Sequence, residues 1–313
     1  MSQDKKPLVG TFKIGGELYT VASSGEARLE EAHFTTPTQI VCKWCGSSNI
    51  MKYGIRDGIQ EYICSKCHRK FTNVDNPYKM RSTSKAIADS LDSYYNGESF
   101  ADIADKRLKE GQAVNESTVY RWVMSYTEKA IKFFDQYHPK VGTIWVGDET
   151  VLNIAGKKVW LYDVIDKETR FLLSARLTVN YGRTTVDAQR VMEDAAKRAG
   201  ITPKEVITDK QNSYLDGIEQ AFGSDTEHIL GKPFTRGMSE NTNRIERWHG
   251  TLKERYKVLR GFKTVETANT ILAGIIIDYN FLRPHLALKG KTPAEAAGLN
   301  LSIKSWNELV ERE

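Results

Sequence analysis

The sequence lacks a hydrophobic run long enough to cross a membrane. Its longest apolar stretch, Ile271–Ile277, contains Gly274 and is followed by Asp278, whereas a span needs about 18 residues. Residues 1–6 carry charges with no apolar core behind them, so they do not resemble a signal peptide. With only 8 prolines, 40% hydrophobic residues and 27% charged residues, the composition excludes a disordered or fibrous chain. We expect a soluble protein of the cell interior.

The net charge is small but unevenly distributed. The 313 residues, about two or three domains in length, include 45 Lys and Arg against 40 Asp and Glu. Residues 42–86 contain nine Lys or Arg against three acids, and residues 231–291 contain twelve against five. Two basic zones in a nearly balanced chain indicate two surfaces that meet a polyanion, although charge alone also fits ordinary solvated faces.

All four cysteines occur in one short segment. Cys42 and Cys45 form one CxxC pair, Cys64 and Cys67 form another, and eighteen residues separate the pairs. Four thiolates at this spacing can surround one zinc ion. Two disulfides are the alternative, but thiols stay reduced inside cells and neighbouring CxxC pairs favour a metal. The sequence therefore predicts a structural zinc site.

The segment around these cysteines, residues 38–76, is predicted to be a zinc ribbon. Residues 50–54 and 60–64 are typical of two strands, turned at Asp57-Gly58. A segment this short buries little apolar surface, so we expect the metal to hold it folded. Four basic side chains on it are expected to contact DNA phosphates: Arg56, Lys66, Arg69 and Lys70.

Residues 80–138 are predicted to form a helix-turn-helix domain. Ser84 is expected to cap a first helix that ends at Asn96-Gly97, Ser99 a second, and Ser117 a third. The third helix of such a motif enters the major groove by its N-terminal residues. Those residues are Glu116, Thr118, Tyr120 and Arg121. A plain helical bundle remains the alternative from periodicity alone.

Residues 140–298 have the pattern of an α/β domain. Strands are predicted at residues 143–148, 159–165, 170–179, 205–209 and 227–230, with helices at 183–199, at 212–222 and from near Ser239. Three antiparallel strands followed by alternating helices and strands is the order of an RNase H-like domain. We therefore predict a mixed five-stranded sheet covered by helices.

Three acidic residues are placed to meet in this domain. Asp148 and Asp209 each follow an apolar strand, and Glu246 lies on the long helix. Three carboxylates can hold two hard divalent cations, Mg²⁺ or Mn²⁺, which prefer oxygen ligands. Two such ions activate a water or a 3′-hydroxyl and stabilise the departing oxygen of a phosphodiester. The neighbouring Glu149 is expected to point to the opposite face of its strand.

The long helix also presents a face suited to DNA. Glu246, Gly250, Lys253 and Lys257 recur at helical spacing, and His249 lies on the same side. A carboxylate, a residue without a side chain and two cations can hold metal and admit a DNA backbone. The alternative is a solvated charged face, because other charged residues surround this helix.

These residues resemble a known family. The segments Gly147-Asp148-Glu-Thr, Ile-Thr-Asp209-Lys, Ile-Glu246-Arg-Trp-His249-Gly-Thr-Leu-Lys253 and Leu-Arg-Gly-Phe-Lys-Thr-Val-Glu-Thr-Ala-Asn are similar to those of DDE transposases of insertion sequences. The resemblance spans residues 40–298 and is greatest to the insertion-sequence-six group. It implies that Asp148, Asp209 and Glu246 bind the catalytic metals and that Lys253 contacts DNA.

The sequence therefore predicts a DNA transposase of a prokaryotic cytoplasm. It would bind the terminal inverted repeats of an insertion sequence, cleave the strands and join them to target DNA, as a homodimer or larger homo-oligomer. The alternatives are a transposase-derived DNA-binding regulator without catalysis and a structure-specific RNase H-like nuclease that does not join strands. Residues 1–37 are expected to be an N-terminal arm with two short β-like runs, and residues 299–313 a C-terminal tail.

Overall fold

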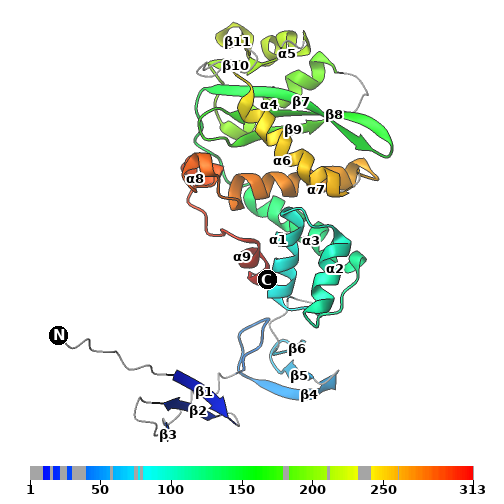
Figure 1. Ribbon diagram of the computed structural model, residues 1–313, viewed down its shortest axis with the longest axis vertical. Helices are drawn as coiled ribbons and strands as arrows, with labels where there is room; N and C mark the ends of the chain where they lie inside the picture. The colour runs from blue at the N-terminus through cyan, green and yellow to red at the C-terminus, as the bar shows by residue number, and fades with distance from the viewer. Residues whose placement is uncertain are drawn as a thin grey trace, which may run out of the picture. The chain divides into compact units, whose positions relative to one another are not determined.

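A computed structural model of the chain describes residues 10–14, 17–21, 27–29, 40–56, 59–73, 77, 80–178, 183–209, 212–231, 241–259 and 261–312. The chain forms two compact units, Met1–Val74 and Asp75–Glu313 (Figure 1). The boundary lies two residues before the predicted end of the zinc-ribbon segment.

The first unit contains two antiparallel sheets of three strands each. One sheet consists of β1 (Gly10–Ile14), β2 (Glu17–Val21) and β3 (Ala27–Leu29), so both β-like runs expected near the N-terminus are strands. The other consists of β4 (Ile50–Arg56), β5 (Ile59–Cys64) and β6 (Lys70–Thr72). The predicted turn at residues 57–58 lies outside the described residues, and β6 adds a strand that the sequence did not predict.

The segment Ile40–Asn73, called the ribbon below, has a very small core. Its buried hydrophobic residues are Cys42, Cys64 and Phe71, among the residues that the structure describes there. Tyr62 stacks on Phe71 at 5.7 Å between ring centroids. Apolar burial on this scale stabilises a fold only slightly, so another source of stability is required.

The second unit begins with three helices, α1 (Ser84–Tyr95), α2 (Phe100–Lys109) and α3 (Glu116–Phe134). A side-chain oxygen caps each N-terminus by accepting a backbone N–H, as helix starts require. Ser99 caps α2 as predicted, whereas Thr83 caps α1 and Asn115 caps α3, one and two residues before the predicted serines. The three predicted helices therefore exist, with shifted starts.

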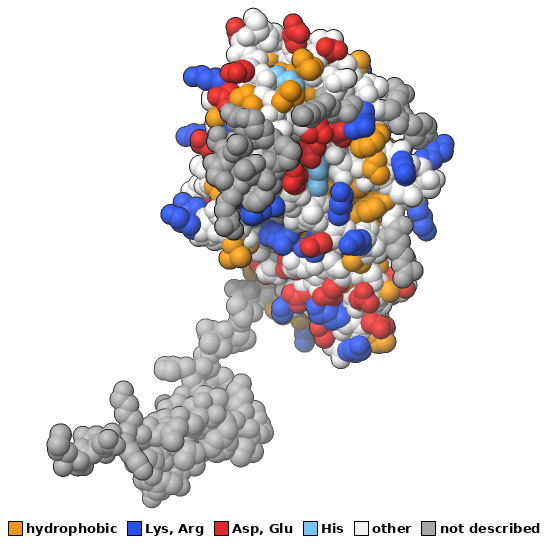
Figure 2. Space-filling model, turned by 45° about the horizontal axis from the view of Figure 1, so that its top comes forward, with side chains coloured by type: hydrophobic (Ala, Val, Ile, Leu, Met, Phe, Trp, Pro, Cys, Tyr) orange, Lys and Arg blue, Asp and Glu red, His pale blue; other side chains and the backbone are white. Residues whose placement is uncertain are grey.

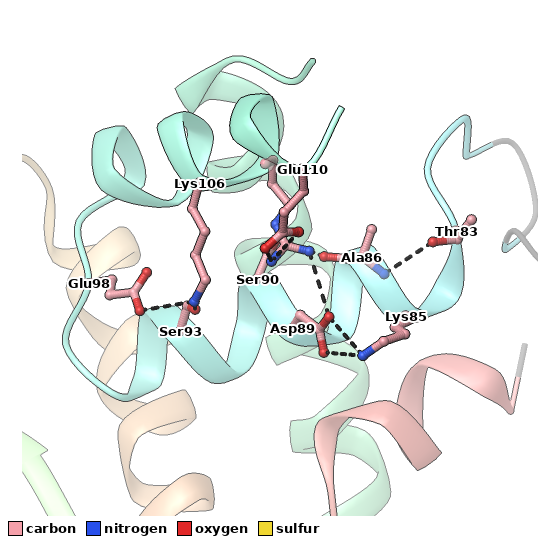
Figure 3. Close-up of polar contacts among 10 residues, drawn as sticks. Thr83, Lys85, Ala86, Asp89, Ser90, Ser93, Glu98, Lys106 and Glu110 are labelled. Carbon is pink, nitrogen blue, oxygen red and sulfur yellow. Dashed lines mark hydrogen bonds and ion pairs between the residues drawn. The ribbon is translucent and has the colours of Figure 1, made fainter. Parts of the chain in front are cut away.

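Polar contacts join α1 to α2 (Figure 3). Lys106 donates to the Ser93 hydroxyl at 2.9 Å and forms an ion pair with Glu98 at 3.3 Å. The Arg107 side chain is 3% exposed and lies 2.9 Å from a Glu110 oxygen and 3.7 Å from an Asp89 oxygen. Because the buried guanidinium has both acids as partners, its burial does not leave an isolated charge.

A five-stranded sheet forms the centre of the second unit. Its strand order is β11 (Glu227–Leu230), β10 (Glu205–Thr208), β7 (Ile144–Ile154), β8 (Lys157–Asp166), β9 (Leu172–Leu177). β7 and β8 pair antiparallel, as do β8 and β9, whereas β10 pairs parallel with both β7 and β11. This mixed five-stranded sheet has the strand order of the RNase H-like fold that the sequence predicted.

Helices cover this sheet and connect its strands. The crossover elements are α4 (Thr185–Ala199), α5 (Asn212–Phe222) and the short η1 (Gly223–Asp225), and α6 (Asn243–Leu259) follows β11. α5 and β11 have the predicted bounds. The expected start of the long helix near Ser239 lies outside the described residues, and the described helix begins at Asn243.

The C-terminal part of the chain is helical. It consists of α7 (Val265–Ile277), a π-helical turn η2 (Asp278–Leu282), η3 (Leu286–Leu288), α8 (Pro293–Ala296) and α9 (Trp306–Glu311). The segment Val265–Leu288 is long and apolar enough to span a membrane by length and composition, which the sequence analysis did not recognise. In the structure α7 lies between the sheet and helices α1–α3, with Ile271 and Leu272 buried in the core (Figure 1).

The helical region and the sheet share one continuous hydrophobic core. Gly274 of α7 lies so close to Tyr95 of α1 that a side chain at this position would overlap the tyrosine ring. The predicted C-terminal tail also joins this core, because Trp306 is fully buried and stacks on Tyr95 at 4.7 Å. The predicted boundaries at residues 138 and 299 therefore do not separate compact units.

Candidate active site and zinc centre

Asp148 and Asp209 meet at the point where two parallel strands diverge. The sequence predicted that Asp148 ends a strand, but β7 continues to Ile154 and Asp148 lies in its middle. β10 pairs with β7 only from Glu205 to Ile207 and ends at Thr208, so Asp209 leaves the sheet beside Asp148. Carboxylate oxygens of these two aspartates lie within 4.8 Å of each other.

Glu149 belongs to the same group of oxygens, although it was predicted to point to the opposite face of its strand from Asp148. One of its oxygens lies within 4.8 Å of those of Asp148 and Asp209. Its side chain is only 3% exposed, and Arg183 donates to Oε1 at 2.8 Å, while Oε2 has no described partner. Burial raises the pKa of Glu149, Arg183 opposes that rise, and the two aspartates add to it. Where β10 ends, side chains from both faces of β7 therefore reach the same point.

His249 connects α6 to the acid pair. Its Nε2 lies 2.9 Å from Oδ2 of Asp163, and its Nδ1 lies 3.4 Å from Oδ2 of Asp148. Asp163 is fully buried on β8, directly opposite Asp148 in the antiparallel ladder. Burial alone would lower the pKa of His249, but the two carboxylates raise it to about 9. The histidine was predicted to contact DNA; in the structure it is buried between two aspartates.

Glu246 lies one helical turn before His249 on α6. It is exposed and accepts a hydrogen bond from the Thr242 hydroxyl at 2.7 Å, and it is not in the group of oxygens within 4.8 Å. Lys253 and Lys257 are exposed on the same helix, and Gly250 has open space around it. In Figure 2 acidic side chains lie beside a histidine near the middle of the face shown, with Lys and Arg side chains around them.

The four cysteines converge in the ribbon as predicted. All four sulfur atoms lie within 4.8 Å of one another, and Cys42–Cys67 and Cys45–Cys64 are each 3.6 Å apart. A zinc–sulfur bond of about 2.3 Å in a tetrahedron places sulfurs about 3.8 Å apart, so these distances fit a zinc ion. The backbone N–H of Cys67 is the main cause that lowers the pKa of Cys64, whereas at Cys45 a backbone hydrogen bond at Ser47 is outweighed by burial and the other three thiols, which raise the pKa.

Two basic residues predicted to contact DNA have aromatic neighbours on the ribbon. The guanidinium of Arg69 lies 5.8 Å from the ring centre of Trp44, and Nζ of Lys70 lies 3.5 Å from that of Tyr53. Arg56 is exposed at the end of β4. In such a pair the basic side chain can contact a nucleic-acid phosphate, and the aromatic ring can stack on a base.

The residues predicted to enter the DNA major groove lie at the start of α3. The Arg121 guanidinium donates to the carbonyl of Ser117 and to the Thr118 hydroxyl, each at 3.1 Å. Tyr120 is 36% exposed and meets the ring of Phe100 edge-on. These side chains are accessible and partly held in place before any partner binds.

Sequence reasoning missed Asp163 and Arg183. A signal for Asp163 existed, since it is the one acid inside the otherwise apolar predicted strand 159–165, where a buried carboxylate needs a partner. Arg183 had no local signal, because its partner Glu149 lies 34 residues away in the chain.

Sequence comparisons relate part of this chain to a known family. Residues 142–285 match a family model described as a DDE domain, of the IS240 type. The transposase for insertion sequence-like element IS431mec of Staphylococcus aureus is 28% identical over 208 residues, 65% of this chain and 88% of that protein. The transposase for insertion sequence element IS257 in transposon Tn4003, also from Staphylococcus aureus, matches to the same extent.

Two solved structures are more distant. The HTLV-2 integrase catalytic core domain in complex with magnesium has 18% identity and a TM-score of 0.39, covering 51% of this chain and 97% of that one. The catalytic core domain of BIV integrase has 18% identity and a TM-score of 0.37, covering 49% and 92%.

Proposed function

We propose that the chain is a transposase that binds the terminal inverted repeats of an insertion sequence and catalyses metal-dependent strand cleavage and strand transfer; the match of residues 142–285 to a DDE domain supports this. The observation that carries the proposal is the convergence of the Asp148 and Asp209 carboxylates, 60 residues apart in the chain, within 4.8 Å. Relatives 28% identical over 208 residues are transposases of insertion sequences, which supports the same activity here.

The donor set suits hard divalent cations. Asp148, Asp209 and Glu246 would hold two Mg²⁺ or Mn²⁺ ions, because carboxylate oxygens are the ligands these ions prefer. When bound, such ions would supply the charge that activates a water or 3′-hydroxyl and stabilises the leaving oxygen. Within the chain, His249 orients the Asp148 carboxylate, and its bond to Asp163 holds α6, which carries Glu246, beside β7 and β8. This second layer restricts how the ligands can move.

DNA recognition is assigned to the ribbon and to helices α1–α3. One structural zinc ion on Cys42, Cys45, Cys64 and Cys67 would hold the ribbon folded. Arg56 and Arg69 would contact phosphates, and the side chains at the start of α3, Thr118, Tyr120 and Arg121, would face the bases. Lys253 and Lys257, exposed on α6, would hold the backbone near the acids.

The proposed reaction also has consequences for the oligomeric state and the cellular location of the protein. Two element ends must be processed together, so we propose a homodimer or larger homo-oligomer on double-stranded DNA. The substrate is chromosomal or plasmid DNA, so the protein would act at the nucleoid in a prokaryotic cytoplasm.

Three substitutions test the active site. Asp148→Asn, Asp209→Asn and Glu246→Gln should each reduce cleavage of a duplex carrying the flanking repeats of this gene by about a thousandfold, since several kcal/mol of metal-based stabilisation is lost. DNA binding should persist in all three. Asp194→Asn, which changes an exposed acid paired with Arg176 on the surface, is the matched control and should cleave normally.

Other results of these assays would support one of the alternative functions or a different metal site. DNA binding by the wild-type chain without cleavage in Mg²⁺ or Mn²⁺ would leave a transposase-derived regulator. Cleavage without joining of a labelled donor end to target DNA would leave a structure-specific nuclease. Substantial cleavage by any of the three variants would mean that the metal site is wrongly assigned.

A further inference from the structure

A second concentration of positive charge lies at the end of the sheet where β7 begins. A cavity of about 360 Å³ is lined there by residues from four separate segments, including Ile144 of β7. Lys167, Glu168 and Arg170 come from the β8–β9 turn, Arg244 from the first turn of α6, and Ala287 and Leu288 from η3. The fold therefore brings three cations and one acid, distant in sequence, around one hollow.

The β8–β9 turn presents Arg170 on a rigid backbone. Oδ2 of the buried Asp166 accepts hydrogen bonds from the Thr169 N–H at 2.7 Å and the Thr169 hydroxyl at 2.6 Å, and Oδ1 accepts from the Gly142 N–H at 3.0 Å. Arg170 itself has a φ of 60°, in the left-handed region, and its N–H donates to the Asp166 carbonyl. A non-glycine residue in this region costs on the order of 1 kcal/mol and persists only where its surroundings hold it.

The arginines that line this cavity, and the nearby Arg247, have no acidic partner among the described residues. Among the residues that the structure describes, Arg170, Arg244 and Arg247 form no ion pair. Other arginines of the same unit do, since Arg176 pairs with Asp194 at 2.7 Å and Arg183 with Glu149 at 2.8 Å. Burial lowers the pKa of Arg170, and the nearby Arg244 and Arg247 lower it further. Guanidinium groups stay charged at any physiological pH, so their convergence favours an anion between them.

We propose that Lys167, Arg170 and Arg244 form a binding site for a backbone phosphate of double-stranded DNA. Arg244 lies two residues before Glu246 on α6, so one helix carries both a residue of this cavity and a proposed metal ligand. A guanidinium binds phosphate oxygens through paired N–H groups, which suits a fixed arginine such as Arg170. The choice of DNA as the source of the phosphate rests on the proposed function. The convergence of the three cations is independent of that function.

The salt dependence of DNA binding tests this site. The full chain, without added Mg²⁺ or Mn²⁺, is titrated with a fluorescent mixed-sequence duplex at several salt concentrations. Each phosphate contact contributes about 0.9 to the slope of log affinity against log salt. Arg170→Gln and Arg244→Gln should each weaken binding and reduce the slope by about 1, and the double variant by about 2. Glutamine retains part of the arginine stem, which limits damage to packing.

Matched variants separate this site from general loss of charge or fold. Arg176→Gln removes an equal charge from β9 and should leave the slope unchanged, because Arg176 already pairs with Asp194. Arg170→Lys retains the charge and should retain most of the slope. An unchanged slope in the Arg170→Gln, Arg244→Gln double variant would overturn the proposal. A change of oligomeric size with an unchanged slope would also overturn it and would assign the cavity to a second copy of the chain.

Failure of this proposal is distinguishable from failure of the proposed function. If the wild-type chain does not cleave DNA but the slope falls in the double variant, the phosphate site stands and the enzymatic function does not. If the wild-type chain cleaves and the slope is unchanged, the reverse holds.

Discussion

In the ribbon, Cys42, Cys64 and Phe71 make up the buried hydrophobic residues among those described, whereas the unit Asp75–Glu313 has one core that runs from α1 through the sheet to α9. Two of the three buried ribbon residues are thiols placed for a metal. The larger unit uses aromatic and aliphatic side chains, including the fully buried Trp145, Trp248 and Trp306. With zinc bound as proposed, metal coordination would stabilise the small fold, whereas apolar burial stabilises the large one.

The largest effect should come from removing the zinc. Cys64→Ser should unfold the ribbon, because a structural zinc site contributes about 10 kcal/mol or more to folding. Zinc content per chain and hydrogen exchange of backbone amides measure this: protection should vanish in β4–β6 and remain in the sheet of Asp75–Glu313. His68→Asn, which changes the residue next to Cys67, should keep both the zinc and the protection. Protected β4–β6 amides in zinc-free Cys64→Ser would contradict the difference drawn between the two regions.

A smaller effect should come from opening the large core. Trp306→Ala removes a fully buried side chain that stacks on Tyr95, and loss of a buried tryptophan costs about 3–5 kcal/mol. Urea unfolding of Asp75–Glu313 should shift accordingly, while the zinc content stays the same. The exposed Ser302→Ala serves as the control. A loss below about 1 kcal/mol, the size of a typical surface change, would show that the C-terminal segment does not belong to this core.

The smallest effect should be a gain in stability. Burial raises the pKa of Asp278 to about 6, against a hydrogen bond from Trp306 and the charges of Arg283 and Arg255. An acid whose folded pKa is raised favours folding below its unfolded pKa near 4, and this contribution is lost as pH rises through 6. Asp278→Asn should therefore stabilise Asp75–Glu313 by on the order of 3 kcal/mol at about pH 7.5, and by almost nothing at about pH 4.

Unfolding free energies measured at both pH values decide this prediction. Asp105→Asn, at an exposed acid on α2, is expected to have no such pH-dependent gain. Destabilisation of Asp278→Asn at neutral pH would mean that Arg255 and Arg283 outweigh the burial of the carboxylate, and that this part of the core depends on charge as well as on apolar packing.

Local sequence patterns predicted the elements whose signals are local. The bounds of α5 and β11 were predicted, and Ser99 was identified as a cap, because periodicity and capping act within a few residues. The helices beyond α6 were not predicted. α7 is apolar on most sides because it is enclosed by the core, so it lacks the polar face on which the amphipathic pattern depends.

The two candidate metal sites also differ in how far the sequence predicted them. The convergence of the four cysteines was predicted, since each CxxC pair brings two thiols together in one turn and both pairs are close in sequence. The carboxylate site was predicted only in part. Glu149 was expected to face away because neighbouring strand residues alternate, yet the edge left where β10 ends lets its side chain reach the aspartates.

The amino-acid sequence by itself determined the cluster of four cysteines, the order of strands and helices in the RNase H-like domain, and the two aspartates that meet in it. These depend on spacing and on hydrophobic patterning, which are properties of neighbouring residues. Only the tertiary structure decided that Asp163 holds His249 against Asp148, that α9 joins the core of α1, and that Arg170 and Arg244 share one cavity. Each of these depends on contacts between residues more than 70 positions apart, which the local sequence does not encode.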